Sequence, residues 1–288
     1  MDLARYNQFI EQLVANLKTD SRVLGLIALG SMAQRSRMPD DWSDHDFFVI
    51  TIPGEQENFR QNRAWLPDSD QIVLHIRETE HGLKVLYAYG HLIEFAVFDL
   101  DELNIAKVND CRILLDQANI ADHLNQTVQA SASAPLDESR AFSLFLSLLL
   151  VGAGRAARGE ILSAHRFIKD HALANLLPLL AAHLPADASA KARLDNLDAF
   201  RRFEIVFPDI APQIHDILLL PPVIAAQHLL TFADQHLSAA LPDYPTQAIT
   251  VVRDYLAKVT DHTACQYTAF MERGKNSGAC SIPEIGEG

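Results

Sequence analysis

Two neighbouring segments decide the fold of this chain: VLGLIALGS at residues 23–31 and, after a loop, SDHDFFVI at residues 43–50. The first is an apolar run that stops at a glycine, which predicts a buried strand leading into a tight turn. The second is rich in β-branched and aromatic residues after its acidic start, which predicts another strand. We expect these strands to be neighbours, so that the turn lies beside the acidic residues.

The acidic start of the second strand holds Asp44 and Asp46, two residues apart. Because side chains alternate along a strand, both carboxylates are expected on one face. Carboxylates this close repel each other unless a cation lies between them, and Mg²⁺ binds through one or two carboxylates plus substrate phosphates. Gly30 and Ser31 add backbone N–H groups and a hydroxyl, the usual cradle for phosphate oxygens. A lone Asp-x-Asp is most often a solvated turn, but the combination predicts a metal–triphosphate site.

This combination resembles the signature of the polymerase-β-like nucleotidyltransferase superfamily, in which Gly-Ser is followed by a loop, Asp-x-Asp and apolar residues. Residues 30–31 and 44–46 fill the pattern, although residues 34–35 are Gln-Arg where many members have a glycine. The resemblance implies a mixed sheet, ATP or another nucleoside triphosphate as co-substrate, and two Mg²⁺ ions held by Asp44 and Asp46. Two metal ions stabilise both the attacking and the leaving oxygen of an in-line displacement.

Glu94 is a lone carboxylate within the apolar run LIEFAVF at residues 92–98. A charge in such a strand is costly unless it is paired or bound to a metal, so an edge position or an ion pair is the ordinary explanation. The fold resembled calls for a third carboxylate on a later strand, and Glu94 fits as metal ligand, as base for the acceptor hydroxyl, or as both. Asp99 is the competitor, but it is better placed to cap a helix that begins near residue 101.

Four arginines are candidates for contact with the triphosphate. Arg35 and Arg37 follow the Gly-Ser turn and could neutralise phosphate charge, although loop arginines are usually solvated. Residues 152–160, GAGRAARGE, resemble the turn between two helices in lincosamide and aminoglycoside nucleotidyltransferases. Arg155 and Arg158 are three residues apart, so one helix face can present both to the nucleotide or the acceptor. Both arginines also fit a helix C-terminus, where cations are favourable, and the two explanations stay open.

The amino-acid composition indicates which class of partner and which cellular compartment to expect. The 288 residues carry a formal net charge of −13, and no basic stripe is present to follow a nucleic-acid backbone. An acidic chain suits a cationic small molecule instead. Three widely spaced cysteines, Cys111, Cys265 and Cys280, indicate free thiols in a reducing cytoplasm. The N-terminus lacks the pattern of a signal peptide, and the longest apolar run, residues 142–154, is too short to span a membrane.

The expected architecture is α+β: a nucleotidyltransferase-type catalytic domain at residues 1–130, an all-helical bundle at 136–271, and a disordered tail at 272–288. The small and polar stretch 129–135 predicts the boundary. Besides the two strands described, the first half contains an amphipathic helix over residues 3–17 and further elements by the same periodicity rules. These are a helix at 55–65, a strand at 72–75, a hairpin at 83–98 and a last strand at 112–116. In the second half, the periodicity of apolar residues predicts helices at 139–159, 161–183, 190–207, 214–219, 223–241 and 246–271. Whether the protein forms a homodimer is left open.

The function predicted is transfer of a nucleoside monophosphate, by default AMP from ATP, to a hydroxyl of a small antibiotic-like acceptor with release of pyrophosphate. One alternative is a protein-modifying, AMP-adding nucleotidyltransferase, although those resemble the minimal domain alone and this chain has a long helical second half. Another is a regulatory module that binds nucleotides without catalysis. An intact set of Asp44, Asp46 and Glu94 argues against the last alternative.

Overall fold

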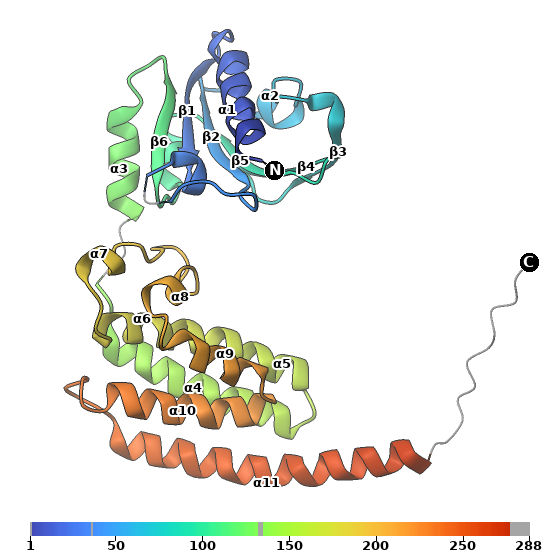
Figure 1. The fold of residues 1–288 in the computed structure, drawn as a ribbon, viewed down its shortest axis with the longest axis vertical. Coiled ribbons are helices and arrows are strands. Elements are labelled where there is room, and N and C mark those ends of the chain that lie inside the picture. Colours follow the sequence, from blue (N-terminus) through green and yellow to red (C-terminus); the bar gives the residue numbers. More distant parts are fainter. Residues whose placement is uncertain (1, 36, 132–134, 277–288) are drawn as a thin grey trace, which may run out of the picture. The chain divides into compact units, whose positions relative to one another are not determined.

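The structure, a computed structural model, describes residues 2–35, 37–131 and 135–276, with only the backbone for 263–276. It divides into two compact units, residues 1–133 and 134–288, which are described separately (Figure 1).

The first unit is built on a six-stranded sheet in the spatial order β3-β4-β5-β2-β1-β6. Its strands are β1 (Val23–Leu29), β2 (His45–Thr51), β3 (Ile72–Arg77), β4 (Gly82–Tyr87), β5 (Leu92–Phe98) and β6 (Cys111–Asp116). The pair β2–β5 is parallel and the other four pairs are antiparallel. The predicted neighbours β1 and β2, the hairpin β4–β5 and the strands β3 and β6 are all present.

The two faces of this sheet are covered by different helices. On one face, Phe9 and Leu13 of α1 (Leu3–Lys18) pack on Phe47 and Phe95. On the other face, apolar side chains of the sheet pack against α3 (Ala121–Ser131) and the short 3₁₀ segment η3 (Glu102–Ile105). Figure 1 shows α1 and α3 on opposite sides of the sheet. Because side chains alternate along a strand, each sheet residue can be assigned to the α1 face or the α3 face.

Helix α1 begins where its sequence predicts. The Asp2 carboxylate accepts a hydrogen bond from the Arg5 N–H at 2.9 Å, which satisfies one of the N–H groups left open in the first turn. The buried residues of α1 are Tyr6, Phe9, Leu13 and Leu17, spaced by three and four as in any helix that covers a sheet. Tyr6 therefore occupies a core position.

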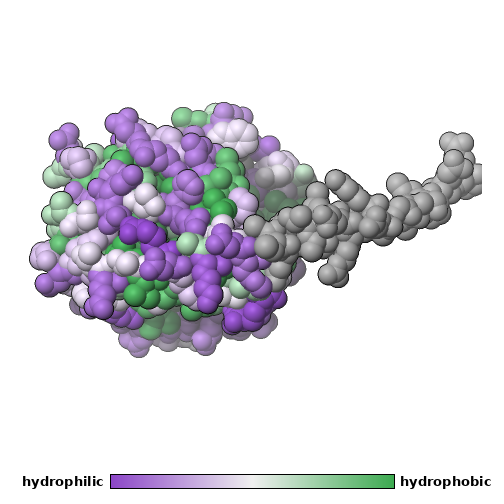
Figure 2. Space-filling model, turned by 90° about the horizontal axis from the view of Figure 1, so that it is seen from below, coloured by the Kyte–Doolittle hydropathy of each residue, from purple (hydrophilic) through white to green (hydrophobic). Residues whose placement is uncertain are grey.

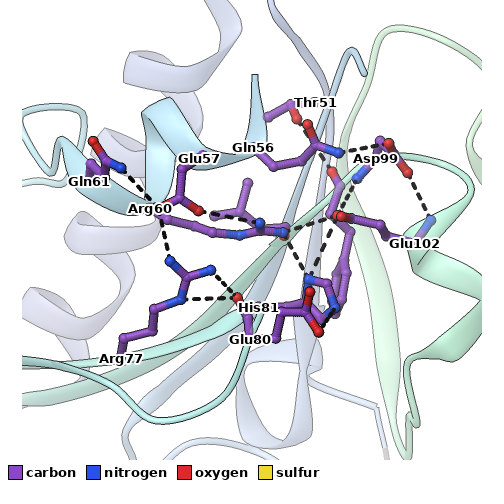
Figure 3. Close-up of polar contacts among 12 residues, drawn as sticks. Thr51, Gln56, Glu57, Arg60, Gln61, Arg77, Glu80, His81, Asp99 and Glu102 are labelled. Atoms are coloured by element: carbon purple, nitrogen blue, oxygen red, sulfur yellow. Dashed lines mark hydrogen bonds and ion pairs between the residues drawn. The ribbon is translucent and has the colours of Figure 1, made fainter. Parts of the chain in front are cut away.

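Arg60, in α2 (Gln56–Gln61), lies beside the C-terminal end of β5. Its side chain is 7% exposed, and Nη2 donates to the Val97 carbonyl, to Nδ1 of His81 at 2.9 Å and to Oε2 of Glu102 at 3.0 Å. Figure 3 shows Glu57 and Arg77 around the same group. The guanidinium thus joins α2, the β3–β4 turn, β5 and η3.

The second unit is helical, with no strand among its described residues 135–276. Its elements are α4 (Glu138–Ala157), α5 (Ile161–His165), the π-helical η4 (Arg166–Ala172), α6 (Leu173–His183), α7 (Ala188–Lys191), α8 (Phe203–Val206), α9 (Ala211–Leu219), α10 (Pro222–Leu237) and α11 (Thr246–Asn276). The prediction of a mixed sheet followed by helices is confirmed.

Helix α4 forms the centre of the second core. By length and composition it could cross a membrane, but seven of its side chains, among them Phe142, Phe145 and Leu149, are buried in the apolar cluster of this unit. Figure 2 shows a surface on which hydrophilic residues predominate, with smaller hydrophobic patches between them. The apolar character of α4 is thus explained by its place in the core.

Three segments differ from the expected helices. Residues 190–207 form only the short α7 and α8 with turns between them, because Asp195 and Asp198 accept hydrogen bonds from the N–H groups two residues on, which competes with helix formation. The helix expected at 55–65 is limited to α2. Of the stretch 272–288, expected to be disordered, residues 272–276 belong to α11 and residues 277–288 lie outside the described part of the chain.

Candidate functional site

Asp46 and Glu94 lie opposite each other in the parallel pair β2–β5. Their sequence neighbours Phe47 and Phe95 stack in the core on the α1 face, with ring centroids 5.3 Å apart. By the alternation of the strands, Asp46 and Glu94 therefore share the α3 face. Both are half-buried, and Asp44 precedes them on the same side by two residues. Sequence distance gives no sign of this pairing, which the parallel register produces.

The Gly-Ser turn lies against these carboxylates. Gly30 has φ +51°, and a Cβ atom at this position would lie 3.6 Å from Oδ2 of Asp46. Glycine is the residue that adopts this left-handed conformation without strain, so it allows the turn to approach the carboxylate. However, the Gly30 N–H donates to the Asp110 carbonyl at 2.9 Å. This N–H, which we expected to bind phosphate, is already used within the protein.

Tyr6 ties the turn to the acidic strand. Its hydroxyl donates to the Asp44 carbonyl at 3.0 Å and lies 3.5 Å from Oγ of Ser31. Burial raises the pKa of Tyr6 to about 12, with a smaller contribution from the charges of Asp44 and Asp46, so the phenol stays a neutral donor. The sequence analysis missed this residue, because its spacing is that of an ordinary core position.

His45, between the two aspartates, points to the opposite face, where it stacks on Tyr6 with centroids 3.8 Å apart. Its Nε2 is 3.1 Å from the Tyr6 carbonyl and its Nδ1 is 2.6 Å from Nε2 of His91. A carbonyl only accepts, so a neutral His45 carries its proton on Nε2 and His91 donates to Nδ1. Burial lowers the pKa of His45 to about 3 and that of His91 to about 4, with His91 adding to the shift of His45. The pair fixes the start of β2 to the β4–β5 turn.

Lys84 is a second residue that the sequence analysis missed. It is the cross-strand neighbour of Glu94 in β4–β5, and its Nζ lies 3.1 Å from Oε1 of Glu94 and 2.9 Å from Oε1 of Glu78. Hydrogen bonds from Lys84 to Glu78 and Glu94 raise its pKa above the ordinary range. Glu94 therefore forms an ion pair, which is the ordinary explanation for a carboxylate in an apolar strand.

The residues present fit a magnesium ion bound together with a nucleotide. Within the described ranges, no group of three or more His, Cys, Asp or Glu side chains is arranged to hold a metal. Mg²⁺ does not require such a group, because one or two carboxylates with phosphate oxygens and water complete its shell. Asp46 and Glu94, paired in the register of β2 and β5, offer hard oxygen ligands of this kind, and Gly30 beside Asp46 has no side chain. Asp44 as a metal ligand remains a prediction.

Asp99, the competitor of Glu94, lies at the other end of β5. Its Oδ1 accepts from the Glu102 N–H at 2.8 Å and its Oδ2 from Nε2 of Gln56 at 2.7 Å. It thus caps η3, as the sequence indicated.

The four candidate arginines have different surroundings. Arg35 is exposed after the Gly-Ser turn, and its charge partly offsets the rise that burial causes in the pKa of the Cys111 thiol. Arg37 lies 3.9 Å from Asp40. Arg155 and Arg158 both bind Glu160, at 2.6 Å and 3.3 Å, where α4 ends. The structure thus gives Arg155 and Arg158 local partners in the second unit, and their contact with a nucleotide remains a prediction.

Comparison with known proteins adds little to this description. The sequence matches no known family profile, and a search of curated proteins finds no match. A search of solved structures finds an aminoglycoside 6-adenyltransferase from Bacillus subtilis, 14% identical, with 90% of this chain and 97% of that chain covered and a TM-score of 0.32. A TM-score at this level supports no argument about fold or function, which therefore rest on the geometry above.

Proposed function

We propose that this protein is a metal-dependent nucleotidyltransferase that transfers AMP from ATP, or another nucleoside monophosphate, to a hydroxyl of a small acceptor. The observation that supports this most is the side-by-side placement of Asp46 and Glu94 on one sheet face, with the Gly30 turn against Asp46. Two half-buried carboxylates in neighbouring strands are costly unless a cation or a proton comes between them. Nucleotidyl transfer uses a cation, Mg²⁺, and moves a proton, that of the acceptor hydroxyl.

In this proposal Asp44 and Asp46 bind Mg²⁺, with Glu94 available as a further ligand. The metal supplies charge neutralisation for the triphosphate and orients its α-phosphorus. Glu94 accepts the proton of the acceptor hydroxyl, directly or through one water. The new bond joins the acceptor oxygen to the α-phosphorus, the bond to the bridging oxygen of the β-phosphate breaks, and pyrophosphate leaves with that electron pair. Lys84 holds Glu94 when no substrate is bound.

The acceptor is proposed to be a small, cationic, antibiotic-like molecule that reacts in the cytoplasm. The net charge of −13 supports a cationic acceptor through long-range attraction. A module that binds nucleotides without catalysis is the second candidate, and the Lys84–Glu94 ion pair favours it, because that pair occupies the proposed base.

The test is incubation of the full chain with α-labelled ATP, Mg²⁺ and a panel of amine-bearing and neutral hydroxyl compounds. We expect a labelled product with one acceptor class and one pyrophosphate released per transfer. Asp46→Asn abolishes transfer without changing the circular dichroism spectrum, and Asp99→Asn, at the far end of β5, is the control. Full turnover in Asp46→Asn contradicts the proposal; binding of ATP without transfer to any acceptor supports the non-catalytic candidate.

A further inference from the structure

The first unit contains an open pocket of about 480 Å³ next to Asp44, a volume within the range of roughly 300–1,000 Å³ typical of small-ligand sites. Three segments line it: the start of α1 with Asp2 and Arg5, residues 41–44 before β2, and residues 89–92 at the β4–β5 turn. Of the proposed catalytic carboxylates, Asp44 lines the pocket, which thus lies where β2 and β5 begin.

Trp42 is the unusual residue in this lining, because it is 92% exposed. Such exposure leaves a large apolar ring in water, where it is available to a ligand. The turn that presents it is fixed: the Trp42 N–H donates to Oδ1 of Asp40 at 3.0 Å, and Ser43 binds Asp40 through its N–H and its hydroxyl. The backbone that carries the indole is therefore a defined turn, two residues before Asp44.

On the opposite wall of the pocket, the charged and aromatic side chains already contact one another. The Arg5 guanidinium lies 3.7 Å from the ring centroid of Tyr89, and Tyr89 stacks in parallel with His91. Arg5 adds a positive charge to a pocket that also holds three carboxylates, and it covers one face of Tyr89. Of the pocket's two aromatic side chains, Trp42 is thus the one with an open ring face.

The carboxylates that line the pocket favour the base of a nucleotide over its phosphates. Asp2, Asp41 and Asp44 contribute carboxylates, which repel phosphates but accept hydrogen bonds from an amino group. Bases of all kinds stack on aromatic side chains, and adenine, cytosine and guanine, unlike uracil, also carry an exocyclic amino group from which a carboxylate can accept a hydrogen bond.

We propose that this pocket binds the nucleobase of the nucleoside triphosphate, stacked on Trp42, with preference for a base that has an exocyclic amino group. The inference rests on the proposed function, since it assumes that the triphosphate lies at Asp44, Asp46 and the Gly-Ser turn. It goes beyond that function by giving the base its own subsite and a reason why UTP is disfavoured.

The experiment measures binding to the full chain by calorimetry without an acceptor, with two probes: MgATP and magnesium tripolyphosphate, which lacks the nucleoside. Trp42→Leu is expected to weaken MgATP about 5- to 150-fold, and to leave tripolyphosphate within about twofold. Trp42→Phe, which keeps an aromatic face, recovers most of the affinity. UTP is expected to bind the wild-type protein more weakly than ATP.

Tryptophan fluorescence gives a second readout, because the chain contains two tryptophans. Trp65 packs among Phe47, Phe59 and Phe95, so in Trp65→Phe the remaining signal comes from Trp42. Quenching of this signal by MgATP but not by magnesium tripolyphosphate supports stacking.

Three outcomes overturn the inference. Equal weakening of both probes by Trp42→Leu shows that the turn acts on the phosphate site, and unchanged MgATP affinity in Trp42→Leu shows that the base does not stack on Trp42. In both cases nucleotide binding by the wild-type protein preserves the proposed function. If the wild-type chain binds neither probe, the proposed function fails as well.

Discussion

The two ends of β5 hold polar clusters of opposite character. At its end, the buried Arg60 donates to acceptors in the β3–β4 turn, β5 and η3, and Asp99 caps η3 (Figure 3). At its start, Glu94 and Asp46 are half-exposed and have Lys84 and the Gly30 turn beside them. A buried charge that donates several hydrogen bonds to other elements holds these elements together, whereas carboxylates that stay accessible can exchange their partners for a metal or a substrate. The comparison predicts that mutations at the start impair activity and those at the end impair stability.

The largest effect is expected for Glu94→Gln. Loss of a positioned general base typically lowers the rate by about 10²–10⁴-fold, and turnover with saturating ATP measures it. Glu78→Gln is the matched control, because Glu78 binds the same Lys84 but lies outside β5. Both variants should keep the melting temperature of the wild-type protein. Equal activity of the two variants would remove Glu94 from the reaction.

Arg60→Met should lower the stability of the protein and leave its turnover unchanged. Without the guanidinium, the Val97 carbonyl and the Glu102 carboxylate lose a buried donor, which costs about 3 kcal/mol of unfolding free energy. Urea denaturation measures this loss, and turnover per folded molecule should stay normal. Arg77→Met is the control, since the Arg77–Glu57 pair is exposed and such pairs contribute about 0–1 kcal/mol. A similar loss for both arginines would argue against a special role of the buried one.

The His45–His91 pair predicts that stability falls as the pH drops from 7 to 5. Both folded-state pKa values, about 3 and about 4, lie below the unfolded value of about 6.5. The unfolded chain therefore binds protons first, and the stability present above pH 6.5 is lost as the pH falls toward these values. We expect each of the two histidines to contribute on the order of 2 kcal/mol between pH 7 and pH 5, measured by urea denaturation. His91→Asn should flatten this dependence; an unchanged slope would show that other groups cause it.

The smallest effect is expected for Tyr6→Phe, which removes the hydrogen bond to the Asp44 carbonyl. A buried hydrogen bond of this kind contributes about 1 kcal/mol to stability. The control is Tyr87→Phe, because the buried Tyr87 hydroxyl makes an equivalent bond to the Pro67 carbonyl at 3.0 Å, away from the carboxylates. Both variants should lose similar stability, and only Tyr6→Phe should also lower turnover. If turnover is equal in the two variants, Tyr6 has a purely structural role.

The sequence by itself determined the elements whose patterns are local. Apolar, β-branched and aromatic runs predicted the strands and the hairpin, the spacing of three and four predicted α1, and the punctuated apolar runs predicted a helical second half. It also selected Asp44, Asp46 and Glu94 as candidates, since acidic residues in apolar strands are conspicuous. It failed at 190–207, where aspartate side chains compete with the backbone hydrogen bonds of a helix.

Only the tertiary structure decided which of these residues meet. The parallel register of β2 and β5 places Asp46 opposite Glu94, and the antiparallel hairpin places Lys84 on the other side of Glu94. Tyr6 reaches Ser31 and Asp44 from a helix that is remote in sequence, and the Asp110 carbonyl occupies the Gly30 N–H. These contacts depend on strand order, register and helix docking, which are set by the packing of the whole core, and side-chain patterns within one segment do not encode them.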